Sequence, residues 1–236
     1  MFGVKGSVKR RSKDAAENPF WISFSDMMTA LMVLFLVVMA VALLSIPKKV
    51  LETEDGSRQH QRKIAQILEK LEEAAKRHEG VVVDKERGII NFGSRAQFEF
   101  GKWQLNESQE SVLREFAPEI LTLANDEIGR SVLKRVVVEG YTDQKGTYLA
   151  NLNLSLQRSQ RVLCALFANA GANVLPEEQK EDVRRLFFVG GYSFNATKDS
   201  DEESRRVEMR LEFLALGESR PEPPLGEVKI GECALR

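Results

Sequence analysis

The chain has 236 residues, of which 34 are Lys or Arg and 35 are Asp or Glu, so its formal net charge is -1. This balance leaves no basic surplus, and no basic face interleaved with aromatic residues is visible, which argues against a nucleic-acid-binding protein. The apolar residues are contiguous between Phe20 and Ile46, whereas the remainder has the periods of an ordinary soluble domain. The composition therefore predicts a membrane anchor and one globular domain.

The anchor is the segment 27–46, which is apolar except for Thr29 and Ser45. A bilayer core about 30 Å thick needs about 20 apolar residues in a helix, so one transmembrane helix is predicted, assigned to residues 20–46. Pro47 is expected to end it. A cleaved signal peptide is the alternative, and the Ala40-Val41-Ala42 stretch would offer a cleavage site, but the apolar run is too long for one.

Basic residues on the two sides of this helix bear on its orientation. They nearly tie in number: Lys5, Lys9, Arg10, Arg11 and Lys13 precede it, and Lys48, Lys49, Arg58, Arg62 and Lys63 follow it. The preceding cluster is dense and nearly free of acids, whereas Glu52, Glu54 and Asp55 come soon after the helix. We therefore expect residues 1–19 to be a basic cytoplasmic tail.

The next segments have the patterns of a helix and a hairpin. Residues 47–79 are predicted to form a linker helix that leads into the domain or pairs with its copy, with Gly80 as the stop. Its apolar positions are Ile64, Ile67, Leu68, Leu71 and Ala75. The stretch VVVDKERGIINF reads as a hairpin closed by Gly88.

The rest of the domain alternates helices with strands. A helix capped by Asn106 and Gln109 carries Val112, Leu113, Phe116, Ile120 and Ala124 on one side, and Pro118 should bend or interrupt it. Strands are predicted in SVLKRVVVEG, in LFFVGG and at 207–213, with a helix at about 147–170. This order predicts an α+β fold: an α/β sandwich over residues 80–216, with a mixed sheet and helices on one face.

After Gly217 the chain is rich in proline and glutamate without a clear period, so residues 217–236 are expected to be a tail that lies on the domain or is loose beside it. Cys164 and Cys233 could form a disulfide in an oxidising compartment, but two cysteines alone do not decide this. The alternative, two free thiols, stays open.

Asp26 is an acid at the leading edge of the apolar segment. If the hydrocarbon begins at Met27, its carboxyl sits at the interface at little cost. If Trp21 marks the boundary, Asp26 lies about 7–8 Å deeper. Ser23, Thr29 and Ala30 are then its small or polar neighbours on one helix face, which suits close approach of partner helices and a carboxyl that exchanges a proton.

The stretch NPFWISFSDMMTALMVLFLVVM resembles the membrane helix of the B subunits of ion-driven rotary stators, the family of the flagellar protein MotB. The resemblance implies that Asp26 carries the ion, with Trp21, Ser25 and Thr29 as neighbours, and we expect that ion to be a proton rather than sodium. The sequence of this helix and the short basic tail resemble the ZorB proteins of Zorya anti-phage defence more than flagellar MotB.

The stretch VEGYTDQKGTYLANLNLSLQRSQRV resembles the signature of OmpA-like peptidoglycan-binding domains. The matching positions are Gly140, Thr142, Asp143, Gly146, Asn151, Leu154, Ser155, Arg158 and Val162. Tyr141 replaces the usual histidine, and Ser204 replaces the usual asparagine before Arg-Arg-Val-Glu. The resemblance implies that Thr142, Asp143, Asn151, Leu154 and Arg158 bind peptidoglycan.

The chemistry of that stretch fits a zwitterionic ligand, which in the family is the diaminopimelate of the peptide stem. Asp143 follows a strand and Arg158 lies on the next helix, so both can reach one cleft mouth. The carboxylate can accept from an ammonium group, and the guanidinium can grip a carboxylate with two hydrogen bonds. The alternative is that Asp143 caps the following helix and pairs internally with Arg158.

Other patterns point to no further site. His60 and His78 lack zinc-ligand spacing with the cysteines, and no metal or cofactor is expected. The acids Asp199, Asp201, Glu202 and Glu203 do not form a calcium loop and are interpreted as a solvated loop. No phosphate loop, nucleophile elbow or dinucleotide motif is present, so no enzyme is expected.

Together these resemblances imply a wall-anchored stator subunit in the bacterial inner membrane, with its C-terminal domain in the periplasm. One spanning helix cannot form a channel, so a multi-span A subunit is required, and the resemblance implies a homodimer inside a pentameric ring of such subunits. The rival functions are a flagellar MotB and a passive wall tether without ion flux.

Overall fold

The structure is a computed structural model that describes residues 18–221 and 228–235. The chain divides into two compact units, one that ends at Gly56 and one from Ser57 to Arg236. The predicted basic tail lies almost wholly outside the described residues.

Helix α1 runs from Asn18 to Ala75 and so belongs to both units. In the first unit, its stretch Ser23–Ala42 is 20 residues long, apolar enough to span a membrane and wholly unburied. No other helix in the described ranges has this length and composition. The helix continues through Pro47, so the end predicted there was wrong. A proline removes one main-chain donor, but the hydrogen bonds on either side of it can persist.

In the second unit, the end of α1 packs into the domain. Ile67 and Leu71 are almost fully buried and belong to the same hydrophobic core as the sheet. The compact unit therefore begins at Ser57, although the sequence pattern placed the domain's start at residue 80. The helix ends at Ala75, and the turn after it reaches Gly80, whose φ of +83° suits glycine.

A five-stranded mixed sheet forms the centre of the domain, in the order β1-β2-β5-β3-β4. The strands are β1 (Val82–Asp84), β2 (Ile89–Asn91), β3 (Leu133–Gly140), β4 (Phe187–Gly191) and β5 (Val207–Phe213). Strands β3 and β4 are parallel, whereas the other neighbours are antiparallel. The predicted hairpin, β1–β2, is confirmed, as are the three later strands.

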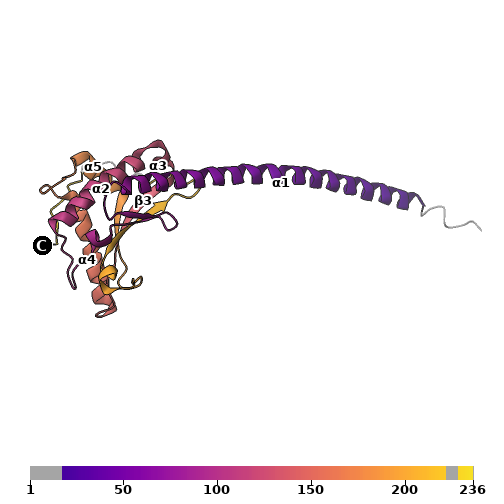
Figure 1. The fold of residues 1–236 in the computed structure, drawn as a ribbon. Helices are drawn as coiled ribbons and strands as arrows, with labels where there is room; N and C mark the ends of the chain where they lie inside the picture. The colour runs from indigo at the N-terminus through magenta and orange to yellow at the C-terminus, as the bar shows by residue number, and fades with distance from the viewer. Residues whose placement is uncertain (1–17, 222–227, 236) are drawn as a thin grey trace, which may run out of the picture. The chain divides into compact units, whose positions relative to one another are not determined.

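Two long helices, α2 (Glu107–Asn125) and α4 (Tyr148–Phe167), pack together and α4 contacts β3 and β4 (Figure 1). The predicted apolar face of α2 is buried, and Asn106 and Gln109 form the predicted capping box. The helix is not interrupted at Pro118. The shorter helices were not predicted: η2 (Gly93–Ala96), α3 (Glu127–Val132), α5 (Glu177–Leu186) and α6 (Asp201–Ser204).

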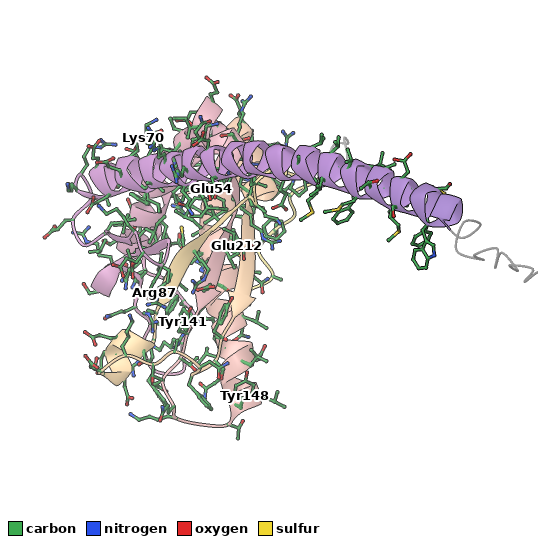
Figure 2. All side chains as sticks on the ribbon, turned by 90° about the vertical axis from the view of Figure 1, so that its right-hand side faces the viewer. Glu54, Lys70, Arg87, Tyr141, Tyr148 and Glu212 are labelled. Carbon is green, nitrogen blue, oxygen red and sulfur yellow. A yellow bond between two sulfur atoms is a disulfide. The ribbon has the colours of Figure 1, made fainter. Side chains whose placement is uncertain are left out.

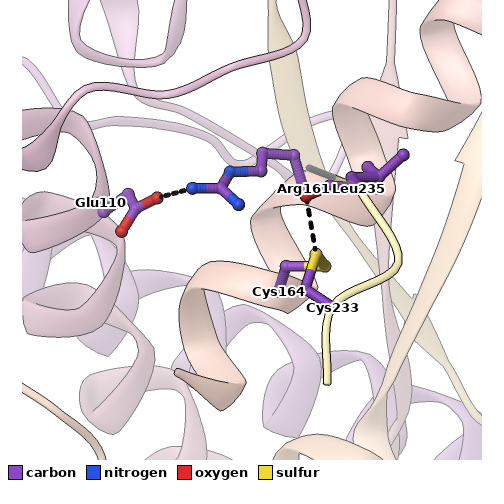
Figure 3. The surroundings of a disulfide bond; sticks show 5 residues. All are labelled: Glu110, Arg161, Cys164, Cys233 and Leu235. Carbon is purple, nitrogen blue, oxygen red and sulfur yellow. Dashed lines mark hydrogen bonds and ion pairs between the residues drawn. A yellow bond between two sulfur atoms is a disulfide. The ribbon is translucent and has the colours of Figure 1, made fainter. Parts of the chain in front are cut away.

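The described part of the C-terminal tail is attached to the domain at two places. The guanidinium of Arg220 donates to the carbonyls of Leu133, Ala124 and Gly129, at 2.9–3.1 Å. Cys233 forms a disulfide with Cys164 of α4 (Figure 3). The tail therefore lies on the domain, and the open question of the two cysteines is decided in favour of a bond.

Candidate functional site

Asp26 lies on an exposed face of the membrane-length helix. It lines a shallow groove along this one helix, together with Thr29, Ala30, Val33, Leu34 and Val37. The hydroxyl of Thr29 donates to the main-chain carbonyls of Ser25 and Asp26, with distances of 2.6 and 3.0 Å. The carboxyl is therefore the one ionisable group in a groove that is otherwise small or apolar.

Trp21 precedes this groove and is 65% exposed. Its ring meets Phe24 edge to face, with 6.5 Å between the centroids. An exposed indole at this place is typical of residues at the membrane boundary, where the apolar ring and the polar N–H both find favourable surroundings.

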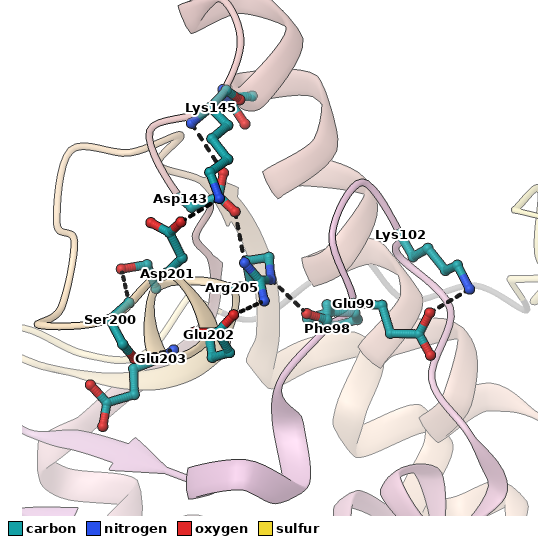
Figure 4. Close-up of polar contacts among 12 residues, drawn as sticks. Phe98, Glu99, Lys102, Asp143, Lys145, Ser200, Asp201, Glu202, Glu203 and Arg205 are labelled. Atoms are coloured by element: carbon teal, nitrogen blue, oxygen red, sulfur yellow. Dashed lines mark hydrogen bonds and ion pairs between the residues drawn. The ribbon is translucent and has the colours of Figure 1, made fainter.

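Thr142 and Asp143 are the second and third residues after β3 and are both buried. The main-chain N–H of Thr142 donates to Ser193 at 2.9 Å, but its hydroxyl has no hydrogen-bond partner among the described residues. One carboxylate oxygen of Asp143 accepts from the main-chain N–H of Lys145 at 3.1 Å. The other oxygen forms an ion pair with Arg205 at 2.9 Å (Figure 4).

Arg158 is fully buried on α4, and its guanidinium faces main-chain carbonyls. It donates to Tyr141 at 2.7 Å, to Lys102 at 3.0 Å and to Glu99 at 3.3 Å. The group also lies over the ring of Phe98, 5.0 Å from its centroid. Burial lowers the pKa of Arg158 to about 10, although the negative charge of Asp143 opposes this shift, so the group is still protonated at neutral pH.

The charge of Asp143 acts on the pKa of Arg158, but each side chain has its own hydrogen-bond partners. The reading in which the two pair directly is wrong, because Asp143 binds Arg205. The reading in which Asp143 caps the next helix is also wrong, because Thr147 is the N-cap of α4 and Asp143 bonds to Lys145 before it. Arg205 was missed, although it lies in the quoted closing motif Ser204-Arg205-Arg206.

Asn151 and Leu154 lie on the first turns of α4. The side-chain amide of buried Asn151 donates to the carbonyls of Lys145 and Thr147, at 2.9 and 3.2 Å, so it holds the loop that follows Asp143. Leu154 is half-buried. Of these two predicted residues, Asn151 supports the loop that follows Asp143.

The acidic run after residue 198 is not a simple solvated loop, which corrects the prediction. Residues 201–204 form the short helix α6, which Ser200 caps through its hydroxyl. Asp201 pairs with Lys145 at 2.6 Å, and Glu202 pairs with Arg205 at 2.8 Å. Figure 4 shows these carboxylates beside Asp143. A helix in four residues has too short a pattern to be recognised from periodicity.

Tyr141, the departure from the usual histidine, is labelled in Figure 2, and its side chain has partners other than Asp143. Its hydroxyl donates to Glu139 at 2.7 Å, and its ring stacks on Tyr192 with 5.4 Å between centroids. Only its main-chain carbonyl meets Arg158. The side chain of Tyr141 is therefore not a hydrogen-bond partner of Asp143.

The histidines have structural surroundings. The Nε2 of His60 lies 2.8 Å from the carbonyl oxygen of Leu214, and His78 meets Phe116 edge to face. Across residues 18–221 and 228–235, no group of three or more His, Cys, Asp or Glu side chains is placed to hold a metal ion.

Known families match both parts of the chain. The OmpA family matches residues 97–207, and the family described as membrane MotB of the proton-channel complex MotA/MotB matches residues 6–50. The Zorya protein ZorB of Escherichia coli O139:H28 (strain E24377A / ETEC) is 42% identical over 224 residues, which cover 93% of this chain and 91% of that protein. The chain belongs to the ZorB family. This ZorB-family chain thus has Asp26 in its MotB-like match and Asp143 in its OmpA-like match.

Solved structures resemble the domain of this ZorB-family chain at low identity. The periplasmic domain of MotB (residues 64–256) is 19% identical, with a TM-score of 0.42, over 60% of this chain and 72% of that chain. The cell wall anchor of the T6SS from Pseudomonas aeruginosa is 21% identical, with a TM-score of 0.40, over 60% and 94%.

Proposed function

We propose that this ZorB-family chain is the wall-anchored B subunit of a proton-driven motor in the inner membrane, and that it serves anti-phage defence. The observation that carries the proposal is Asp26, an acid on an exposed face of the one membrane-length helix in the described residues, in the same chain as an OmpA-type domain. A carboxyl in the lipid-facing part of a helix is costly, so it calls for a partner or a function.

Asp26 is proposed to take up and release the proton at a protein–protein boundary. Desolvation favours the neutral carboxyl and access to water favours the ionised one, so the same group can cycle between them. Trp21, Ser25 and Thr29 surround it in sequence. Each charge that crosses the membrane supplies about 2.3 kcal/mol per 100 mV, which is adequate for repeated small steps.

A single spanning helix leaves the Asp26 groove open on one side. A second copy of the chain and a ring of multi-span A subunits, five in the proposed assembly, would cover it. The N-terminus is placed in the cytoplasm and the domain in the periplasm. The disulfide between Cys164 and Cys233 supports this orientation, because such bonds persist in oxidising compartments.

The domain is proposed to bind peptidoglycan through Thr142, Asp143, Asn151, Leu154 and Arg158. The buried Thr142 hydroxyl lacks a partner within the described part of the chain and precedes an acid, which suits a ligand with an ammonium group. Wall attachment would hold the chain against the torque of the motor. The opposite charges of Asp143 and Arg158 favour a zwitterion such as diaminopimelate.

The test compares Asp26→Asn with the wild type in cells that carry the partner subunit. We expect the variant to insert, assemble and sediment with purified peptidoglycan, but to lose phage protection. Met28→Leu, on the opposite face of the helix from Asp26, is the matched control and should protect fully. Full protection by Asp26→Asn would instead establish a passive tether, and rescue of motility in a flagellar stator mutant would favour a MotB role.

A further inference from the structure

The two charges of the proposed wall site are already occupied within the chain. Asp143 is paired with Arg205, and Arg158 donates to three carbonyls. Both side chains are buried, with exposed fractions of 3% and 0%. A ligand can therefore reach them only if these internal contacts are exchanged for contacts with the ligand.

One loop, Phe98–Lys102, takes part in both sets of contacts and is called here the covering loop. Its carbonyls at Glu99 and Lys102 accept from Arg158, and the ring of Phe98 lies against the same guanidinium. The carbonyl of Phe98 accepts from the Nε of Arg205 at 3.1 Å. The loop thus contacts the Arg158 guanidinium. Figure 4 shows its bond to Arg205, the partner of Asp143.

Arg205 is the residue that joins these contacts. Its guanidinium bonds Phe98, Asp143 and Glu202 through three different nitrogens, and its main-chain carbonyl accepts from the N–H of Phe98 at 2.8 Å. A lysine has one ammonium group and could not hold all three acceptors in this geometry. The planar guanidinium of Arg205 therefore couples Asp143 to the covering loop.

The covering loop has features that permit movement. Gly101 has a φ of +70°, and a side chain placed there would meet no atom within 4 Å. Phe100 is 62% exposed, and its ring meets the ammonium group of Lys145, 5.8 Å from the centroid. A cavity of about 460 Å³, lined in part by Gly101, Lys102 and Trp103, lies beside the loop. Space is therefore available on that side.

We propose that Arg205 is a latch that fills the empty wall site, holding Asp143 and the covering loop until a zwitterionic ligand displaces it. The inference rests on the proposed wall-binding function. The ligand's ammonium competes with Arg205 for Asp143, and its carboxylate competes with neutral carbonyls for Arg158. A carboxylate is the stronger acceptor, so the exchange is favourable once both ends of the ligand are present. The latch also avoids two unpaired buried charges in the empty state.

The latch would control access to the site and would also make the site specific for a zwitterion. A molecule with only one of the two charged groups can replace one set of contacts but leaves the other buried charge without a full partner. Discrimination against such a molecule follows from the cost of an unpaired buried group. Wall attachment would thus respond to the zwitterionic end of a peptide stem and resist other anions or cations in the periplasm.

The test uses the full-length chain in detergent, with Arg205→Lys as the variant and Arg206→Lys as its matched control. The side chain of Arg206 bonds Glu208 and the carbonyls of Ala196 and Glu203, none of which belongs to the covering loop. The first measurement is hydrogen exchange at the Phe98 amide. We expect exchange to be at least tenfold faster in Arg205→Lys and unchanged in Arg206→Lys.

The second measurement is affinity for purified peptidoglycan fragments that carry diaminopimelate. We expect Arg205→Lys to bind about tenfold more tightly, because the ligand no longer has to displace the latch, and Arg206→Lys to bind like the wild type. Equal or weaker binding by a folded Arg205→Lys, or unchanged exchange at Phe98, would overturn the latch. If the wild type itself binds no peptidoglycan, the wall-binding function fails, and the latch fails with it as a gate for that ligand.

A second variant guards against a folding defect in Arg205→Lys. Glu202→Gln removes the exposed carboxylate that holds one nitrogen of Arg205, at a residue outside the buried site. It should speed exchange at Phe98 and raise affinity in the same direction by a smaller factor. If Glu202→Gln changes neither quantity while Arg205→Lys is unfolded, the latch is overturned.

Discussion

The Nη1 of Arg158 donates to the main-chain carbonyl of Tyr141 at 2.7 Å, so the arginine on α4 is bonded to the first residue after β3. This bond and those to Glu99 and Lys102 join a helix, the end of a strand and a loop through one side chain. Arg158 is therefore a residue of the domain's interior as well as a predicted ligand contact. Its substitution should affect folding before it affects binding.

Arg158→Ala is expected to lower the free energy of unfolding by about 3–5 kcal/mol, since it leaves buried carbonyls without a donor and removes a large packed side chain. Denaturant unfolding, followed by Trp103 fluorescence in a Trp21→Phe background, measures this. Gln160→Ala on the exposed side of the same helix is the control and should change stability little. A loss of wall binding with full stability would show that Arg158 acts mainly on the ligand.

The long elements could be predicted because their patterns are long. In β3, β5, α2 and α4, the apolar residues follow the strand or helix pattern over the whole length of the element. The partner of Asp143 could not be predicted in this way, because Arg205 and Asp143 are separated by 62 residues and meet only when β5 pairs with β3. Long-range side-chain pairs follow from strand register, which a local pattern does not contain.

The end of α1 shows a related limit. Ile64, Ile67, Leu68 and Leu71 have helical spacing, but spacing alone does not tell whether the face packs on its own domain or on another copy. The structure decides this for Ile67 and Leu71, which lie in the domain core. The sequence analysis ended the helix at Pro47 because proline lacks a main-chain donor. Helix α1 continues on both sides of Pro47, so the loss of that donor does not end it.

The disulfide between Cys164 and Cys233 closes a loop with a sequence separation of 69 residues. The bond lowers the conformational entropy of the unfolded chain, which stabilises the folded state by up to about 4 kcal/mol. Cys233→Ser should therefore lower the free energy of unfolding by up to this amount in oxidising buffer. In reducing buffer the variant and the wild type should unfold alike, and a persisting difference there would mean that the serine acts through packing instead.

Thr29 tests the nature of the transported ion. Its hydroxyl already donates to the carbonyls of Ser25 and Asp26, so we expect it to support the helix and to play no direct part in proton transfer. Thr29→Val keeps the shape and removes the oxygen. Phage protection should be retained within a few-fold, whereas Asp26→Asn serves as the inactive comparison. A complete loss in Thr29→Val, with normal assembly, would favour a sodium ion that needs this oxygen as a ligand.

Glu139 gives the domain a stability that depends on pH. It is fully buried on β3, with Arg210 bonded to both carboxylate oxygens at 2.7 and 2.9 Å and the hydroxyl of Tyr141 at 2.7 Å. Burial alone would raise the pKa of this carboxyl, but the hydrogen bonds from Arg210 and Tyr141 outweigh it, so the pKa lies below the ordinary 4.5. A lowered pKa means that the folded state binds the proton less readily than the unfolded state does.

The stabilisation is therefore fully present above pH 4.5 and is lost as the pH falls through the lowered pKa of the folded state. Glu139→Gln should cost about 3 kcal/mol at pH 7, because it leaves Arg210 without its charged partner. The difference between variant and wild type should shrink steadily below pH 4.5, where the Glu139 carboxyl becomes protonated first in the unfolded state and, at lower pH, in the folded state. Unfolding curves at pH 7, 5, 4 and 3 measure this, with Glu86→Gln in the exposed hairpin turn as a control that should show no such convergence. A difference that stays constant down to pH 3 would mean that the charge of Glu139 does not stabilise the fold.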